Sequence, residues 1–170
     1  MKRLFFTLAL MFVSAVALNA QSLTGKQWCT KLIVEDGVEV LVALTFDKDG
    51  TCEMLVGSEY QIKEDDVPID MVGMVTVPGT FSHNGKDLKM DLNRKMAEAD
   101  IDYEIKGMDT KTKSILDKHI KSEINGLKKE FKKVMLNGMP KMHNMKIVSL
   151  ESKRLIIKDD NGDEIPFYAE

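Results

Sequence analysis

Alternating apolar and polar residues dominate this chain and predict a protein built mainly of β-strands. Residues 38–46 are apolar at every second position, and the alternation resumes after a turn at Asp49-Gly50. A second segment, 79–92, alternates in the same way around a turn at Asn84-Gly85. Because tight hairpins need positive φ angles, which glycine adopts without strain, both segments predict β-hairpins.

The parity of each strand predicts which side chains face the interior. Successive side chains of a strand point to opposite faces, so one alternating set of each strand is expected to be buried. Residues 98–105 show this most clearly, with acidic residues at every even position. The stretch 58–69 is acidic and contains Pro68, which predicts a loop or a broken edge strand. The predicted interior, and the candidate ligand contacts, are Trp28, Val42, Leu44, Met54, Val56, Leu88, Met90, Ile101 and Tyr103.

The period changes between Lys111 and Leu136, where apolar residues recur every three to five positions. This spacing predicts one amphipathic α-helix over 111–136, with Asp109 or Thr110 as its N-cap and Asn137-Gly138 at its end. Shorter strands are predicted after it, over 145–150, 155–158 and 165–168. The order of strands, one helix and further strands predicts an antiparallel meander that closes into a barrel, with the helix outside it or across one end.

The predicted helix is basic, with eight lysines and three acidic residues. A basic amphipathic helix can lie on an anionic membrane. It can also pack its apolar stripe on Leu41 and Ala43 and place its lysines near the acidic row of residues 98–104. We favour packing, because the apolar stripe of a helix in a single-domain protein usually meets the protein's own core.

The first 20 residues predict a secretory signal peptide. Lys2 and Arg3 precede an apolar run that ends near Ala20. Cleavage there leaves one domain, 21–170, in the periplasm or outside the cell. Without the two leader cations the formal net charge falls from −3 to about −5, which argues against a nucleic-acid partner. No later segment is apolar enough to predict a transmembrane helix, and oligomeric state is not predictable from these patterns.

Residues suited to catalysis or metal binding are few. His83, His119 and His143 each have a local structural explanation, so we expect no enzyme activity. The segment 139–145 combines three methionines with His143, ligands that suit Cu(I), but these methionines can equally pack the helix end against the barrel. The segment 159–164 starts like a calcium loop, yet its glycine comes fourth rather than sixth, which favours a turn. We therefore expect no metal site and no cofactor.

The two cysteines leave two alternatives open. Export favours a disulfide between Cys29 and Cys52. In a meander, however, the first and third strands lie about 9.6 Å apart, beyond the usual reach of a disulfide. Strand parity also places Cys29 outside and Cys52 inside. Two free thiols, or a bond made through a bent first strand, are the remaining possibilities.

Four segments together resemble the lipocalin-like (calycin-type) domains of secreted bacterial proteins. They are Leu23-Thr-Gly-Lys-Gln-Trp28, Phe46-Asp-Lys-Asp-Gly-Thr51, Gly79-Thr-Phe-Ser-His-Asn-Gly85 with Leu88, and Ile147-Val-Ser-Leu150 with Arg154-Leu-Ile-Ile-Lys-Asp159. The resemblance implies a lipocalin-like β-barrel that holds one small hydrophobic ligand among the nine interior residues. The alternative is a non-enzymatic envelope or interaction protein with a filled barrel, which uses its outer surface or basic helix for a partner or membrane.

Overall fold

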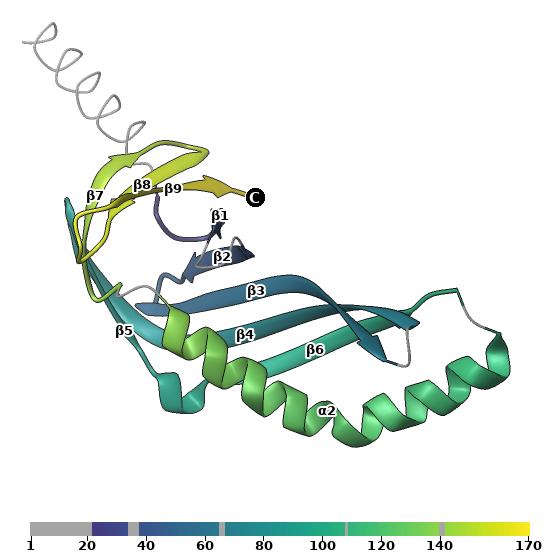
Figure 1. Cartoon of the computed structure of the whole chain (residues 1–170). Coiled ribbons are helices and arrows are strands. Elements are labelled where there is room, and N and C mark those ends of the chain that lie inside the picture. The colour runs from purple at the N-terminus through teal and green to yellow at the C-terminus, as the bar shows by residue number, and fades with distance from the viewer. Residues whose placement is uncertain (1–21, 34–37, 65–66, 108, 140–141) are drawn as a thin grey trace, which may run out of the picture.

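The computed structural model describes residues 22–33, 38–64, 67–107, 109–139 and 142–170. Strands make up most of this part of the chain, and one long helix, α2, lies beside them (Figure 1). In chain order the elements are β1 (Gln27–Ile33), β2 (Glu39–Phe46), β3 (Thr51–Glu64), β4 (Val67–Asn84), β5 (Asp87–Leu92), the short 3-10 helix η2 (Arg94–Met96), β6 (Glu98–Ile105), α2 (Thr110–Gly138), β7 (Asn144–Leu150), β8 (Arg154–Lys158) and β9 (Glu164–Ala169).

Eight of the strands form a closed antiparallel barrel. Their order around the ring is β3, β2, β1, β9, β8, β7, β5 and β4, and β4 pairs again with β3. The strands nearest the two ends of the described chain, β1 and β9, also pair in this ring, with Trp28 opposite Ala169. This confirms the prediction of a mainly β protein whose strands close into a barrel, with one helix before the last three strands. The arrangement is compatible with a lipocalin-like fold.

The predicted hairpin turns are present at both glycines. Gly50, between β2 and β3, has a φ of 88°, and Gly85, between β4 and β5, has a φ of 61°. In the first turn the N–H of Gly50 donates to the carbonyl of Asp47 over 3.2 Å. The glycines thus carry the left-handed backbone that the turn pattern requires.

The prediction of a loop or broken strand over 58–69 is wrong. β3 continues to Glu64, and β4 begins at Val67, so the two strands form one long hairpin. Pro68 is tolerated because pairing between β4 and β6 begins only at Ile69, one residue later. Val38 alternates in sequence with the buried residues of β2, but it precedes that strand and is 43% exposed.

β6 lies outside the ring and extends the sheet on β4. β5 and β6 follow one another along the same edge of β4, which pairs with β5 from Gly79 onward and with β6 before Val77. The outer parts of β3, β4 and β6 therefore project beyond the barrel as a three-stranded sheet (Figure 1). One face of that extension needs a cover.

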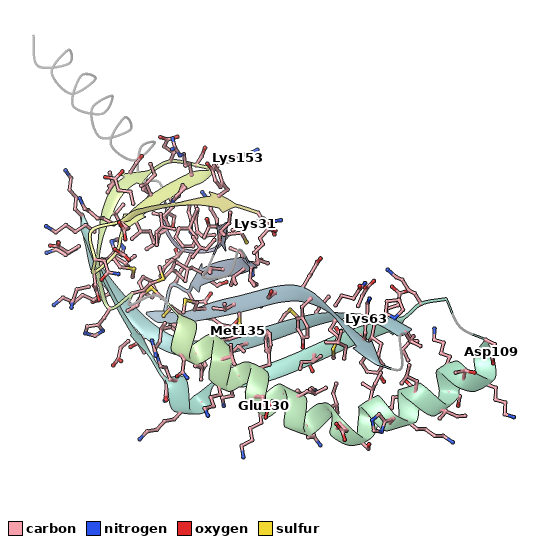
Figure 2. The ribbon with its side chains drawn as sticks, in the orientation of Figure 1. Lys31, Lys63, Asp109, Glu130, Met135 and Lys153 are labelled. Atoms are coloured by element: carbon pink, nitrogen blue, oxygen red, sulfur yellow. The ribbon has the colours of Figure 1, made fainter. Side chains whose placement is uncertain are left out.

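Helix α2 provides the cover. The Asp109 side chain caps it by accepting hydrogen bonds from the N–H groups of Lys111 and Thr112 over 3.0 and 3.1 Å. Figure 2 shows Asp109 at the end remote from the barrel and Met135 close to the barrel. Within the described residues, no helix has both the length and the apolar character needed to span a membrane.

The expected packing of the helix on Leu41 and Ala43 is wrong. These two side chains lie on the opposite face of the sheet, whereas α2 packs on β4 and β6. The expected approach of its lysines to the acidic row is confirmed at one point, where Lys128 lies 2.6 Å from Asp100. The helix and the sheet share a hydrophobic cluster that is separate from the one inside the barrel. Its buried members are Ile120 of α2 and, from the strands, Ile69, Met71, Ile101 and Ile105.

The two hydrophobic clusters share one face of β4. Val75 and Val77 point into the barrel, while Ile69 and Met71, at positions of the same parity, point at the helix. Phe131 of α2 packs against both clusters, and its ring lies directly over Gly73. A Cβ atom at Gly73 would lie only 2.4 Å from Cζ of Phe131. The close approach of helix and sheet thus depends on a glycine at this position.

Candidate binding surface on the outer face of the sheet

The barrel interior is filled by its own side chains. Trp28 is fully buried, and its indole Nε1–H donates to the carbonyl of Leu23 over 2.9 Å. Seven of the nine predicted interior residues belong to the hydrophobic cluster inside the barrel, and none of the seven is more than 3% exposed: Trp28, Val42, Leu44, Met54, Val56, Leu88 and Met90. They pack against Phe46, Leu155 and Phe167, which are also fully buried.

The other two predicted interior residues lie elsewhere. Ile101 and Tyr103 belong to β6 and pack in the cluster under α2, not in the barrel. The Tyr103 hydroxyl donates to Oδ1 of Asp117 on the helix over 2.7 Å. Burial, with this carboxylate, raises the pKa of Tyr103 to about 12. Strand parity correctly predicted the buried face of β6 but not which cluster it joins.

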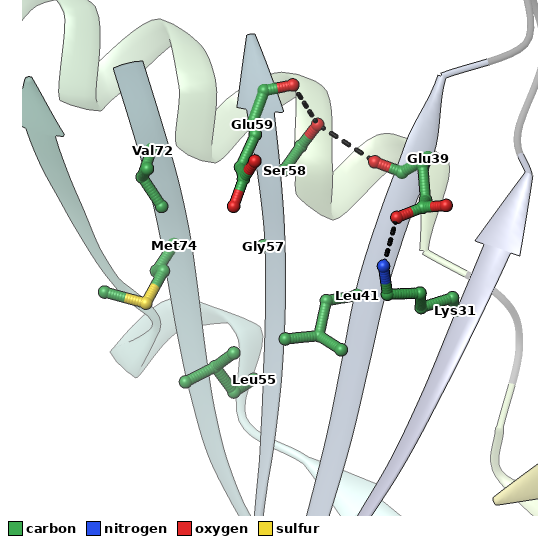
Figure 3. Close-up of a pocket in the computed structure, with 9 residues that line it drawn as sticks. All are labelled: Lys31, Glu39, Leu41, Leu55, Gly57, Ser58, Glu59, Val72 and Met74. Atoms are coloured by element: carbon green, nitrogen blue, oxygen red, sulfur yellow. Dashed lines mark hydrogen bonds and ion pairs between the residues drawn. The ribbon is translucent and has the colours of Figure 1, made fainter. Parts of the chain in front are cut away.

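A groove of about 380 Å³ opens on the outer face of β1–β4 (Figure 3). Its apolar lining comes from three neighbouring strands: Leu41 from β2, Leu55 from β3, and Val72 and Met74 from β4. Leu41 and Val72 are 40% and 39% exposed. Apolar side chains thus meet solvent here without an element of the described chain over them.

Gly57 forms the floor of the groove. The strand registers place Lys31, Leu41, Gly57 and Met74 side by side in one row across β1–β4. Every member of the row except Gly57 has a side chain, so the row is interrupted at its centre. A Cβ atom at Gly57 would come no closer than 3.3 Å to the carbonyl oxygen of Gly73. This contact with a backbone oxygen is tight, so a side chain at position 57 requires a small shift of β4.

Polar groups close one end of the groove. The Lys31 ammonium lies 2.5 Å from the Glu39 carboxylate, and this carboxylate raises the pKa of Lys31. The Ser58 hydroxyl donates to the Glu39 carbonyl over 3.1 Å, so it joins β2 to β3 where their regular pairing ends. The Glu59 side chain stands beside Val72 at the same end (Figure 3).

The sequence contained a weak signal for this groove. Residues 71–77 are apolar at most positions of both parities, so the strand must have an apolar outer face as well as a buried one. The outer side of 39–45 is mixed for the same reason. Gly57 could not be recognised as a floor, because its meaning depends on the residues of the neighbouring strands.

No protein-family model matches this sequence, and no curated protein matches it either. The groove must therefore be interpreted from its own geometry.

The remaining candidate sites have structural roles. Nδ1 of His143 lies 2.8 Å from the Met90 carbonyl, and the His83 ring stacks at 6.3 Å on Phe81. The methionines of the 139–145 segment are buried in the barrel cluster, as expected if they pack the helix end. Among the described residues, no group of three or more His, Cys, Asp or Glu side chains is arranged to hold a metal ion.

The predicted turn after β8 is present. Asp159 is largely buried, and its carboxylate accepts hydrogen bonds from the N–H groups of Asn161 and Asp163 over 2.9 and 2.8 Å. Gly162 has a φ of 95°, which fits a turn. The carboxylate therefore holds the backbone of its own turn.

Both cysteines are free thiols, and Cys52 is buried while Cys29 is half-buried. We expect the unfolded, unreduced protein to show two reactive thiols, and the native protein to react slowly at neutral pH.

Burial, with Asp91, raises the pKa of Cys52 from 9.0 to about 11. The unfolded state loses this proton first, so the free energy of unfolding should fall as the pH rises from 9.0 towards 11. Thiol titration with and without denaturant checks the first expectation, and urea unfolding of wild type and Cys52→Ala across this pH range checks the second. Absence of free thiols in the unreduced chain would contradict both.

Proposed function

We propose that this protein is an exported, non-enzymatic binding protein that takes an apolar group into the groove on the outer face of β1–β4. The observation that carries this proposal is the contrast between the two candidate sites. Seven of the nine predicted ligand contacts are packed against one another inside the barrel, whereas the outer groove is open, partly apolar and about 380 Å³ in volume. Ligand sites in proteins are commonly concave, mostly apolar and of this volume.

The experiment fills the groove from its floor. Gly57→Val adds a side chain at the groove floor, and a β-branched residue suits a strand. Its Cβ would lie 3.3 Å from the carbonyl oxygen of Gly73, so circular dichroism and urea unfolding first establish that the variant is folded. We expect the variant to bind the neutral dye Nile red about tenfold more weakly than wild type, since losing apolar contacts in a pocket costs roughly this much. Fluorescence titration measures the change. Gly126→Val is the matched control, because Gly126 is exposed on α2 and has no atom within 4 Å of an added Cβ.

The competing hypothesis, a small hydrophobic ligand inside the barrel, predicts a different result. Protein purified from its own host would then carry a reproducible small molecule in native mass spectrometry, recoverable by solvent extraction. The Gly57→Val protein would carry the same molecule, because its barrel interior is unchanged. That result, or Nile red binding that is equal in wild type and Gly57→Val, would overturn the outer-groove proposal.

A further inference from the structure

Carboxylates surround the groove on the outer face of the sheet. On β6, the four acidic residues of the even positions lie next to the outward residues of β4, with Asp100 opposite Met74 and Asp102 opposite Val72. Glu59 occupies the next outward position of β3 after Gly57. The outward positions of β1–β4 and β6 carry eight carboxylates: Glu39, Glu53, Glu59, Asp70, Glu98, Asp100, Asp102 and Glu104.

The lysines on or beside this face are fewer than the acids, and they are Lys31, Lys63, Lys106 and Lys128. Lys106 lies 2.6 Å from Asp70 and 3.5 Å from Glu104. Lys128 pairs with Asp100 and Lys31 with Glu39. Within the described residues, no salt bridge involves Glu53, Glu98 or Asp102, and Glu59 attracts Lys31 only across a longer distance, which adds to the effect of Glu39 in raising the pKa of Lys31. The outer face is therefore an apolar groove with an acidic rim.

This combination selects the chemistry of the occupant. An acidic rim repels nucleic acid and anionic lipid, while it attracts a cation that is attached to an apolar group. Resting on the proposed function above, we propose that the groove docks a peptide segment of a partner protein that carries lysine or arginine close to an apolar residue.

The spacing of the outer face agrees with such a segment. In an extended chain, side chains two residues apart lie about 6.8 Å apart on the same face. Glu59 is two residues from Gly57 along β3, so it stands at this separation from the groove floor. Val72 and Asp102 follow Glu59 in the next cross-strand row, so Asp102, which forms no salt bridge within the described residues, lies two strand spacings, about 9.6 Å, from Glu59 and offers a second carboxylate to a lysine or arginine side chain. An apolar side chain over Gly57 and a cation two residues away thus satisfy both parts of the surface.

The experiment compares two fluorescently labelled peptides by anisotropy. In the first, a leucine is flanked on each side, two residues away, by lysine; in the second, glutamate replaces both lysines. We expect the lysine peptide to bind, more weakly as salt rises, and the glutamate peptide not to bind. Glu59→Lys should weaken the lysine peptide about fivefold, as for an exposed rim charge. Glu164→Lys on β9, outside the groove, is the matched charge reversal and should change nothing.

The outcomes separate this inference from the proposed function. If Nile red binding depends on Gly57 but the lysine peptide binds no better than the glutamate peptide, the groove is a binding site and the cationic partner is wrong. If Gly57→Val changes neither dye nor peptide binding, both proposals fail. The basic helix of a second copy is the competing source of cations. Self-association in sedimentation velocity that disappears in Glu59→Lys would assign the groove to that copy and overturn the peptide partner.

Discussion

Replacing Gly79 with alanine should destabilise the barrel by about 3 kcal/mol or more, because the new methyl group would overlap the backbone of the neighbouring strand. An added Cβ would lie 2.5 Å from the carbonyl oxygen of Asp91 and 3.0 Å from Cα of Leu92. Gly79 pairs with Leu92 on one side and with Cys52 on the other, so β4 cannot move away from β5 without disturbing β3. Urea unfolding followed by circular dichroism measures the loss.

Gly126→Ala is the control for Gly79→Ala. Gly126 lies in the exposed part of α2, and an added Cβ meets no atom within 4 Å. Alanine favours the helix over glycine by about 1 kcal/mol, so this variant should be slightly more stable than wild type. A Gly79→Ala protein as stable as wild type would contradict the backbone overlap.

Replacing Gly73 with alanine should cost about 2 kcal/mol, and shortening Phe131 should restore much of that loss. The new Cβ would lie 2.4, 2.6 and 2.7 Å from Cζ, Cε2 and Cε1 of the Phe131 ring. The obstacle here is a side chain, which can be removed, whereas at Gly79 it is backbone. Phe131→Leu alone should cost about 1 kcal/mol, since it loses part of a ring that also stacks at 6.0 Å on Tyr60.

A double-mutant cycle on Gly73→Ala and Phe131→Leu tests this contact. The double variant should be more stable than the sum of the single losses predicts, with a coupling of about 1 kcal/mol or more. Unfolding free energies of the four proteins supply the measurement. Additive losses would show that the helix does not rest on Gly73 through Phe131.

The sequence predicted those features that depend on local patterns. Positive φ at Gly50 and Gly85, the Asp109 cap and the burial of Trp28 all follow from the residues themselves. The continuation of β3 and β4 through 58–69 was missed, because acidic residues and Pro68 usually mark a loop. That hairpin is held by pairing between strands and by the helix across it, neither of which the local composition reports.

The candidate site was less predictable than the fold. Parity shows which side chains share a face but not which strands become neighbours, so Ile101 and Tyr103 were assigned to the barrel instead of the helix cluster. The groove depends on the same missing information. Gly57 lies between Leu41 and Met74 only because the registers of β2, β3 and β4 bring them together.

The ring closes between strands from opposite ends of the described chain. Trp28 and Cys29 of β1 pair with Ala169 and Tyr168 of β9, whereas β3 and β4 form a hairpin of neighbouring segments. Contacts between distant segments cost more loop-closure entropy, so we expect them to form late in folding. Until β9 is available, the edge of β1 that pairs with it has no partner strand. In that interval this edge can mispair with other chains.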